Sequence, residues 1–274
     1  MAMTDTTTLG SADGVAAPRV RARTWRREPL IFLFSAVVMV LLWHVIAATF
    51  FQPQFFPGPL RVATTGIEMI RNGDLFHHVG ASLRRILTGF LIGSAIAIPL
   101  GLLMGTNRYV RMVFEPYTQF FRFIPPIAWL TPVLIWFGIG ETSKVLLIVY
   151  TTIFIVVVNT MVGVSSIAPN KNRAALSLGA SPIQIFRYVT LPAALPFALT
   201  GMRMAMGNSF MTVVSAEMLA ADSGLGYLIF TSRLFMATDQ IFIGIVCLGV
   251  LGMLTDWGFR RVIRRLVHHY GVAE

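Results

Sequence analysis

The chain has 274 residues, of which 55% are hydrophobic and 12% are charged, and its formal net charge at pH 7 is +10. Charged side chains make up about a quarter of a typical soluble domain, so this composition excludes a soluble enzyme or binding module and predicts an integral membrane protein. The basic residues cluster between and outside the apolar runs and form no patch with interleaved aromatic residues. The charge therefore favours a role in membrane orientation and argues against nucleic-acid binding.

The N-terminal part is predicted to hold a tail, one span and an outer linker. Residues 1–29 are rich in Ser, Thr, Ala and Arg and predict a disordered cytoplasmic tail. Arg26 and Arg27 resemble a twin-arginine export signal, but the apolar run 30–51 is too long for the core of a cleaved signal and predicts an uncleaved first transmembrane helix. Residues 52–77 are predicted to be an outer linker, in which 60–74 form an amphipathic segment.

Six apolar runs are each long enough to cross about 30 Å of hydrocarbon. A span satisfies its backbone in lipid as a helix, so we predict an all-α fold with six transmembrane helices. The runs are Leu30 to Phe51, Leu83 to Gly105, Phe114 to Phe137, Val145 to Ile167, Ala193 to Ala221, and Ile241 to Val262. The third run contains Arg122, Pro125, Pro126 and Pro132, and we predict a kinked span that lines a cavity.

The second run has a small residue at every fourth position: Gly89, Gly93, Ala97, Gly101 and Gly105. On a helix these positions form a slowly rotating stripe along which another helix backbone can approach closely. The stripe predicts close helix packing, and a substrate pathway along it is the alternative.

The distribution of Lys and Arg predicts the orientation of the spans. With the N-terminus in the cytoplasm, the inner segments hold the larger share of the basic residues, including the groups at 19–27 and 260–265. Both termini are then cytoplasmic, and residues 263–274 form a cytoplasmic tail.

Several ionisable residues fall within the apolar runs, where each is costly unless it faces a cavity or a partner. They are His44, Arg122, Arg203, Glu217 and Asp256. Arg122 and Arg203 enter from the cytoplasmic side to similar depths, so if their spans are adjacent they form a positive zone suited to an anion. The alternative is that each arginine bonds helix carbonyls or an acidic side chain. Glu217 lies about 21 Å beyond Arg203 along the same helix and is expected to brace the outer gate, while Asp256 is expected to meet Arg260 one turn on.

The sequence carries no motif for chemistry of its own. It has no Gly-x-x-x-x-Gly-Lys phosphate loop, no His-Glu-x-x-His, no Cys/His cluster and no Gly-x-Ser-x-Gly turn, and its single cysteine is Cys247. We therefore predict no catalytic residue and no metal site. The energy for transport is expected from another chain or from an ion gradient, which leaves a secondary transporter or a non-transporting membrane scaffold as alternatives.

The loop between the fourth and fifth runs predicts two short helices. Pro169 and Asn170 are natural helix starters, and Gly179 suits the left-handed stop of the first helix. Ser181 followed by Pro182 predicts a second helix from Pro182 to about Val189. Leu191-Pro192 is then expected to restart the chain into the fifth span.

This loop resembles the EAA loop of importer permeases of the ATP-binding cassette (ABC) superfamily, whose pattern is Glu-Ala-Ala, three residues, Gly, nine residues, Ile, one residue, Leu-Pro. Ala174, Ala175, Gly179, Leu191 and Pro192 match the pattern, while Val189 replaces Ile and Arg173 replaces Glu. Ala216-Glu217-Met218 and the stretch 224–229 resemble the nitrate, sulfonate, taurine and bicarbonate branch.

The resemblance implies the type I ABC importer permease fold, with a five-helix core over 78–262 and a cytoplasmic coupling loop at 168–192. The residues implied for ATPase coupling are Arg173, Ala174, Ala175, Leu176, Gly179, Ala180, Ser181, Leu191 and Pro192. The candidates for the translocation pathway are Arg122, Arg203 and Glu217.

The implied function is ATP-driven import of a small anion across the bacterial cytoplasmic membrane. The implied partners are a second permease copy, two cytoplasmic ATPase subunits that hold ATP and Mg, an external solute-binding protein and membrane lipid.

Overall fold

The computed structural model describes residues 28–267, and these are helical with short connections. The chain divides into two units, Met1–Trp43 and His44–Glu274. Helix α1, Glu28–Thr49, holds the described part of the first unit and continues into the second. Most of its large apolar side chains are exposed, and Ile31–Thr49 is long and apolar enough to span a membrane. The predicted first span is confirmed, although its helix begins two residues earlier than expected, and tail residues 1–27 lie outside the described part.

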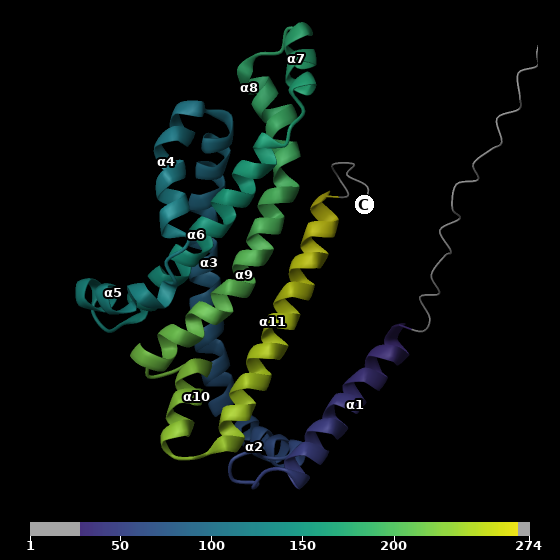
Figure 1. The fold of residues 1–274 in the computed structure, drawn as a ribbon, viewed down its shortest axis with the longest axis vertical. Helices are drawn as coiled ribbons and strands as arrows, with labels where there is room; N and C mark the ends of the chain where they lie inside the picture. The colour runs from purple at the N-terminus through teal and green to yellow at the C-terminus, as the bar shows by residue number, and fades with distance from the viewer. Residues whose placement is uncertain (1–27, 268–274) are drawn as a thin grey trace, which may run out of the picture. The chain divides into compact units, whose positions relative to one another are not determined.

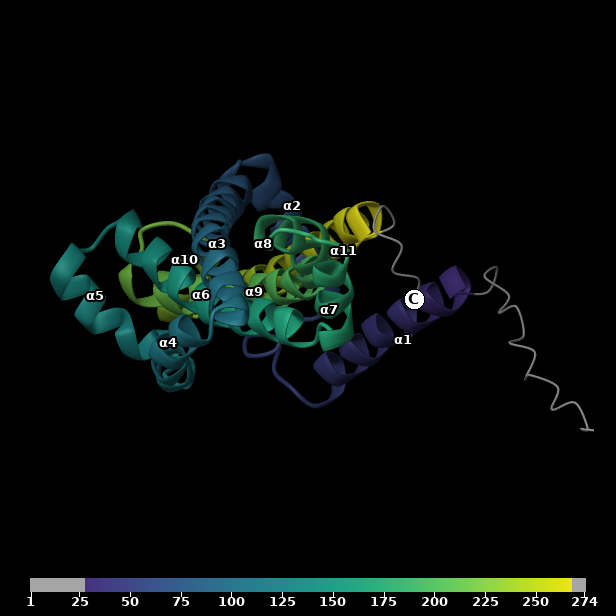
Figure 2. The same cartoon turned by 90° about the horizontal axis from the view of Figure 1, so that it is seen from above.

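The second unit is a bundle built around three long helices, α3 (Asp74–Thr106), α6 (Glu141–Ser165) and α9 (Leu191–Ala220). These helices lie side by side in both views (Figure 1, Figure 2). Helix α6 packs along α3 on one side and along α9 on the other, and α11 packs against α9, α10 and α2. The elements in chain order are α2 Pro59–Arg71, α3 Asp74–Thr106, α4 Arg108–Phe121, η1 Pro126–Trp129, α5 Leu130–Phe137, α6 Glu141–Ser165, α7 Pro169–Ser177, α8 Pro182–Ile185, η2 Phe186–Thr190, α9 Leu191–Ala220, α10 Leu225–Leu234 and α11 Thr238–Val267.

Helices α2 and α11 flank the core and pack against each other. The amphipathic stretch at 60–74 is helix α2, which buries Val62 and Met69 and joins α11 through a hydrogen bond from the Thr65 hydroxyl to Asp239, 2.9 Å. Helix α11 continues to Val267, while the part of it that is long and apolar enough to span a membrane ends at Ile263, next to the start of the predicted tail. Residues 268–274 lie outside the described part.

The predicted third span is not one continuous helix. Helix α4 ends at Phe121, and the η1 and α5 segment leaves it at an angle of 91°. The reason is the pair Pro125 and Pro126, which lack backbone N–H groups and disfavour a helical residue before them. The Tyr150 hydroxyl lies within hydrogen-bonding distance of the carbonyls of Phe121, 2.6 Å, and Ile124, 3.2 Å, at this break. The described residues thus hold five helices long and apolar enough to span, and six if this bent pair is one span.

The small-residue stripe of α3 is a helix-packing surface, as predicted. A Cβ atom added to Gly89, Gly93 or Gly101 would lie 2.6 to 2.7 Å from a side-chain atom of α6, which is closer than real Cβ atoms come. These glycines let α3 and α6 approach along their length. The same device joins α6 to α9, where Gly163 faces Phe197 and Gly201 faces Asn159.

We predict that Gly101→Ala destabilises the protein, because the added methyl group would lie 2.7 Å from the Cβ of Thr160. Overpacking of this kind costs about 1–3 kcal/mol, so the detergent-solubilised variant should unfold several degrees below the wild type in a thermal scan. Gly252→Ala is the matched control, since the space around Gly252 in α11 is open. Equal unfolding temperatures for the two variants would refute the packing role.

Candidate functional site

The first short helix of the loop, α7, ends in the left-handed turn that the sequence predicts. Gly179 has φ +76°, and its N–H donates to the Leu176 carbonyl, 2.9 Å, while the Ala180 N–H donates to the Ala175 carbonyl, 3.1 Å. This pair of bonds is the Schellman motif, in which glycine takes the left-handed position without steric cost. Gly179 therefore sets the angle at which the chain leaves α7.

The second short helix, α8, is fixed at its start by a capping box. The Ser181 hydroxyl accepts from the Gln184 N–H, 3.3 Å, and the Gln184 side chain accepts from the Ser181 N–H, 2.7 Å. Pro182 occupies the first helical turn, where its missing N–H costs nothing. The predicted helix start at Pro182 is confirmed.

The expected restart of the chain at Leu191-Pro192 is wrong, because α8, η2 and α9 form one helical run from Pro182 to Ala220. Pro192 has no N–H and removes one bond of the i→i−4 ladder. The preceding residues adopt π geometry, in which the Leu191 N–H donates to the Phe186 carbonyl five residues earlier. The loop is thus a direct extension of α9.

The α7–α8 segment exposes large apolar side chains at its surface. Leu176 is 58% exposed, Leu178 88% and Ile183 78%. Arg173, which stands where the resembled pattern has Glu, is exposed and takes part in none of the ion pairs found among the described residues. Leu178 and Ile183 were not among the predicted coupling residues, although an apolar side chain directly after the polar helix α7, as at Leu178, is a signal that the sequence offers.

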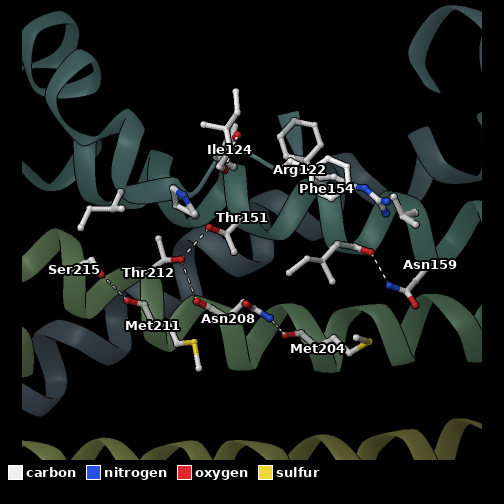
Figure 3. Close-up of a pocket in the computed structure, with 16 residues that line it drawn as sticks. Arg122, Ile124, Thr151, Phe154, Asn159, Met204, Asn208, Met211, Thr212 and Ser215 are labelled. Atoms are coloured by element: carbon white, nitrogen blue, oxygen red, sulfur yellow. Dashed lines mark hydrogen bonds between the residues drawn. The ribbon is translucent and has the colours of Figure 1, made fainter. Parts of the chain in front are cut away.

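A cavity of about 640 Å³ lies between the α4–η1 connection, α6 and α9 (Figure 3). Its wall combines one guanidinium group with hydroxyl, amide, aromatic and thioether side chains. The lining residues are Arg122, Phe123, Ile124, Pro126, Ile127, Tyr150, Thr151, Phe154, Ile155, Val158, Asn159, Met204, Asn208, Met211, Thr212 and Ser215. The prediction that the interrupted third run lines a cavity is confirmed.

The polar groups of the cavity are held by their own helices and by each other. The hydroxyls of Thr151 on α6 and Thr212 on α9 are hydrogen-bonded across the helix interface, 2.9 Å. Asn159 donates to the Ile155 carbonyl, 2.8 Å, and Asn208 donates to the Met204 carbonyl, 3.1 Å (Figure 3). These bonds orient the side chains and leave the amide oxygens and further N–H groups available to a solute.

Arg122 is the one formally charged side chain in the wall of this cavity. It follows α4 directly and is exposed, and its guanidinium lies 4.7 Å from the ring centre of Phe123. A guanidinium presents forked donors that match the oxygens of carboxylates and sulfonates. Arg122 therefore places one positive charge in the wall of the cavity.

The structure does not place Arg203 in this wall. Its guanidinium makes a two-point ion pair with Asp256 of α11, at 2.5 and 3.1 Å, and Asp256 also pairs with Arg260 at 3.1 Å. The expected contact of Asp256 with Arg260 is confirmed. Arg203 thus binds an acidic side chain, which was the predicted alternative to an anion site. The two arginines do not both line one cavity.

Glu217 also lies outside the cavity wall, and its side chain is fully buried. It pairs with Arg85 of α3 at 2.8 Å, an arginine that was not among the predicted site residues. The missed signal is spacing, because Arg85 precedes Gly89 and Gly93 by one and two helical turns and shares their packed face. Glu217, a candidate for the translocation pathway, is thus buried away from the cavity wall, and its expected role in bracing the outer gate stays a prediction.

Known proteins carry the same sequence pattern and fold. The chain is 38% identical over 245 residues to the taurine transport system permease protein TauC of Escherichia coli, a match covering 87% of this chain and 89% of that protein. It is 33% identical over 259 residues to the SsuC permease protein of Bacillus subtilis, whose name assigns it to aliphatic sulfonate transport, covering 91% and 94%.

A solved structure of the MetNI methionine ABC transporter, in an inward-facing conformation, matches with a TM-score of 0.60 at 20% identity, over 69% of this chain and 94% of that chain. This likeness confirms the type I ABC importer permease fold. The family model described as "Binding-protein-dependent transport system inner membrane component" matches residues 97–268. The chain therefore belongs to the binding-protein-dependent transport system inner membrane components, as a permease of the ABC transporters.

Proposed function

We propose that the chain is the transmembrane subunit of an ATP-driven, binding-protein-dependent importer of small sulfonates and related anions. The observation that carries the proposal is the continuous helical run from Pro182 to Ala220. Its first part is the exposed segment α8, and side chains of its later part, including Met204 and Asn208, line the cavity. At 1.5 Å per residue, a push on α8 is carried about 30 Å into the wall of the cavity.

The energy is proposed to come from two separate cytoplasmic ATPase subunits, which hold ATP and Mg. The sequence has no phosphate loop of its own, and the apolar side chains of Leu176, Leu178 and Ile183 offer a partner a surface to bind. The glycine turn at Gly179 and the capping box at Ser181 support the same role. A segment that transmits force must keep its shape, and both features fix the local backbone.

The cavity supports a small anion as the solute. Arg122 supplies positive charge, while Thr151, Asn208 and Ser215 supply hydrogen-bonding groups beside apolar and aromatic side chains. A sulfonate presents three oxygens to such donors and an organic group to the apolar wall. Taurine, named for the similar permease of Escherichia coli, has this chemistry.

The assembly is proposed to contain two copies of the chain and one external solute-binding protein. The excess of basic residues near the N-terminus and in the loop 168–192 supports an orientation with both termini and the α7–α8 segment in the cytoplasm. In that orientation the α9–α10 end of the bundle faces the external binding protein.

Reconstitution tests this function. The chain is placed in proteoliposomes with the ATPase and the solute-binding protein with which it copurifies, and uptake of labelled taurine, nitrate and bicarbonate is measured with and without ATP. We expect ATP-dependent uptake of taurine that disappears with an ATPase variant unable to hydrolyse ATP. Uptake that needs no ATPase and collapses with an ionophore would contradict the proposal and favour a secondary transporter.

A further inference from the structure

A single buried arginine joins three helices at the end of the bundle opposite α7 and α8. Arg85 of α3 is 1% exposed. One terminal nitrogen of its guanidinium donates to Glu217 of α9 at 2.8 Å. The other terminal nitrogen and Nε donate to Glu141 of α6 at 2.6 and 2.8 Å. Separation of the adjoining ends of α6 and α9 would therefore break the ion pair of Arg85 with either Glu141 or Glu217.

The same group fixes the turn between α9 and α10. Glu217 accepts from the Ser82 hydroxyl, at 2.8 and 2.9 Å, and from the Gly226 N–H at 2.9 Å. Ser82 in turn accepts from the Leu225 N–H at 2.8 Å, and Arg85 donates to the Ser223 carbonyl at 2.6 Å. We call Ser82, Arg85, Glu141, Glu217 and the turn 223–226 the outer clamp.

The backbone of the outer clamp packs tightly against the Glu217 carboxylate. Gly224 has φ +116° and lies directly on the Glu217 carboxylate, so a side chain there would be both strained and obstructed. Glu217 and Ser82 are fully buried, and their hydrogen bonds satisfy charges and polar groups that water cannot reach. A buried polar network that is fully satisfied holds one geometry.

Other ion pairs of the described residues do not have this form. Arg111 and Glu115 pair at 2.9 Å within helix α4, so they join no two elements. Arg203 and Asp256 join α9 to α11, but both side chains are more than one third exposed. Among the described residues, Arg85 and Glu217 form the ion pair in which both side chains are buried, 1% and 0% exposed, while the second partner of Arg85, Glu141, is 44% exposed.

Residues of the outer clamp are also close in sequence to residues that line the cavity. Ser215, in the cavity wall, precedes Glu217 by two residues on α9, and Tyr150 follows Glu141 by nine residues on α6. We propose that Arg85 and Glu217 are positioning residues that keep the outer ends of α3, α6 and α9 and the α10 turn in one rigid unit throughout transport. This inference rests on the proposed function, because the motion that the clamp transmits begins at α8.

The first test compares coupling in reconstituted complexes, measured as solute imported per ATP hydrolysed. Glu217→Gln leaves Arg85 without its buried counter-charge, and we expect coupling to fall at least tenfold while basal ATP hydrolysis persists. Ser82→Ala removes only one hydroxyl, and we expect a fall of about threefold in a complex that still assembles. Glu115→Gln is the matched control, since it breaks an ion pair within one helix, and coupling should stay within about twofold of the wild type.

These variants separate the two proposals. A wild-type complex that imports no solute with ATP refutes the proposed function. A wild-type complex that transports, together with normal coupling in Ser82→Ala and in Glu217→Gln, refutes the clamp alone. Loss of assembly in Glu217→Gln leaves Ser82→Ala to decide, because its coupling must fall if the clamp acts as stated.

A distance measurement tests rigidity with the clamp intact. Spin labels are attached at the exposed positions Phe76→Cys on α3 and Leu234→Cys on α10, in a Cys247→Ala chain diluted with unlabelled copies. We expect the same distance distribution without nucleotide and with the ATPase trapped by ATP and vanadate. A shift of the main distance between the two conditions would overturn the rigid clamp and make it a latch that opens.

Discussion

Gly179→Asp should lower ATP-dependent uptake at least tenfold while the subunit still reaches the membrane in normal amount. The variant places a carboxylate at the turn between α7 and α8, where the partner ATPase is proposed to bind, and where the glycine has φ +76°. No atom lies within 4 Å of an added Cβ, so the side chain meets no obstruction and the fold of the spans is kept. Uptake and ATP hydrolysis are measured in the same proteoliposomes, and hydrolysis should continue without uptake.

Gly179→Asn is the matched control. Asparagine has the shape of aspartate without its charge, and it tolerates the left-handed conformation better than most residues, which lose about 1 kcal/mol there. This variant should keep more than half of the uptake. Normal uptake by Gly179→Asp, or an equal loss in both variants, would contradict a charge-sensitive docking surface at this turn.

Arg122→Ala should lower uptake of a sulfonate about tenfold without affecting assembly. Arg122 is the charged group of the cavity wall, and its removal deletes a charge-assisted contact, for which about 1.5–3 kcal/mol is usual. Initial uptake rates are measured over a range of concentrations of the loaded binding protein, and the ATPase subunits are quantified in the purified complex.

Two further arginine variants sharpen this result. Arg122→Lys keeps the charge but loses the forked donors, so it should fall between Arg122→Ala and the wild type. The sequence makes Arg203 a second candidate for the translocation pathway. Because Arg203 pairs with Asp256 outside the cavity wall, we now expect Arg203→Ala to affect uptake less than Arg122→Ala does. The reverse order would restore Arg203 as the residue that meets the anion.

The turn and cap of the α7–α8 segment could be predicted from the sequence, because the residues that form them interact locally. The glycine stop, the Ser181 cap and Pro182 each act within one helical turn, and the structure forms all three as expected. The continuity of α8 with α9 was not predictable in the same way. Pro192 normally breaks a helix, and the π segment that accommodates it depends on the register of the whole run.

The third apolar run shows where length and hydropathy mislead. Its composition suits a span and its prolines predict a kink, but the sequence does not show that the bend is as large as 91° or that Tyr150 contacts the carbonyl of Phe121 at this point. Arg85 was missed for a related reason. A basic residue near the end of an apolar run is normally exposed, and only the packing of α3 against α6 and α9 shows that this one is buried.

The most direct test of the account is whether ATP at the partner subunits changes access to the cavity. Ser215→Cys, in a Cys247→Ala chain, places one thiol in the cavity wall. Its labelling by a membrane-impermeant maleimide is measured from each side of the membrane, without nucleotide and with the ATPase trapped by ATP and vanadate. We predict that trapping raises labelling from outside and lowers it from the cytoplasm, and that Gly179→Asp abolishes this change. Labelling that is the same with and without ATP on both sides would contradict the transmission of ATPase motion through α8 and α9.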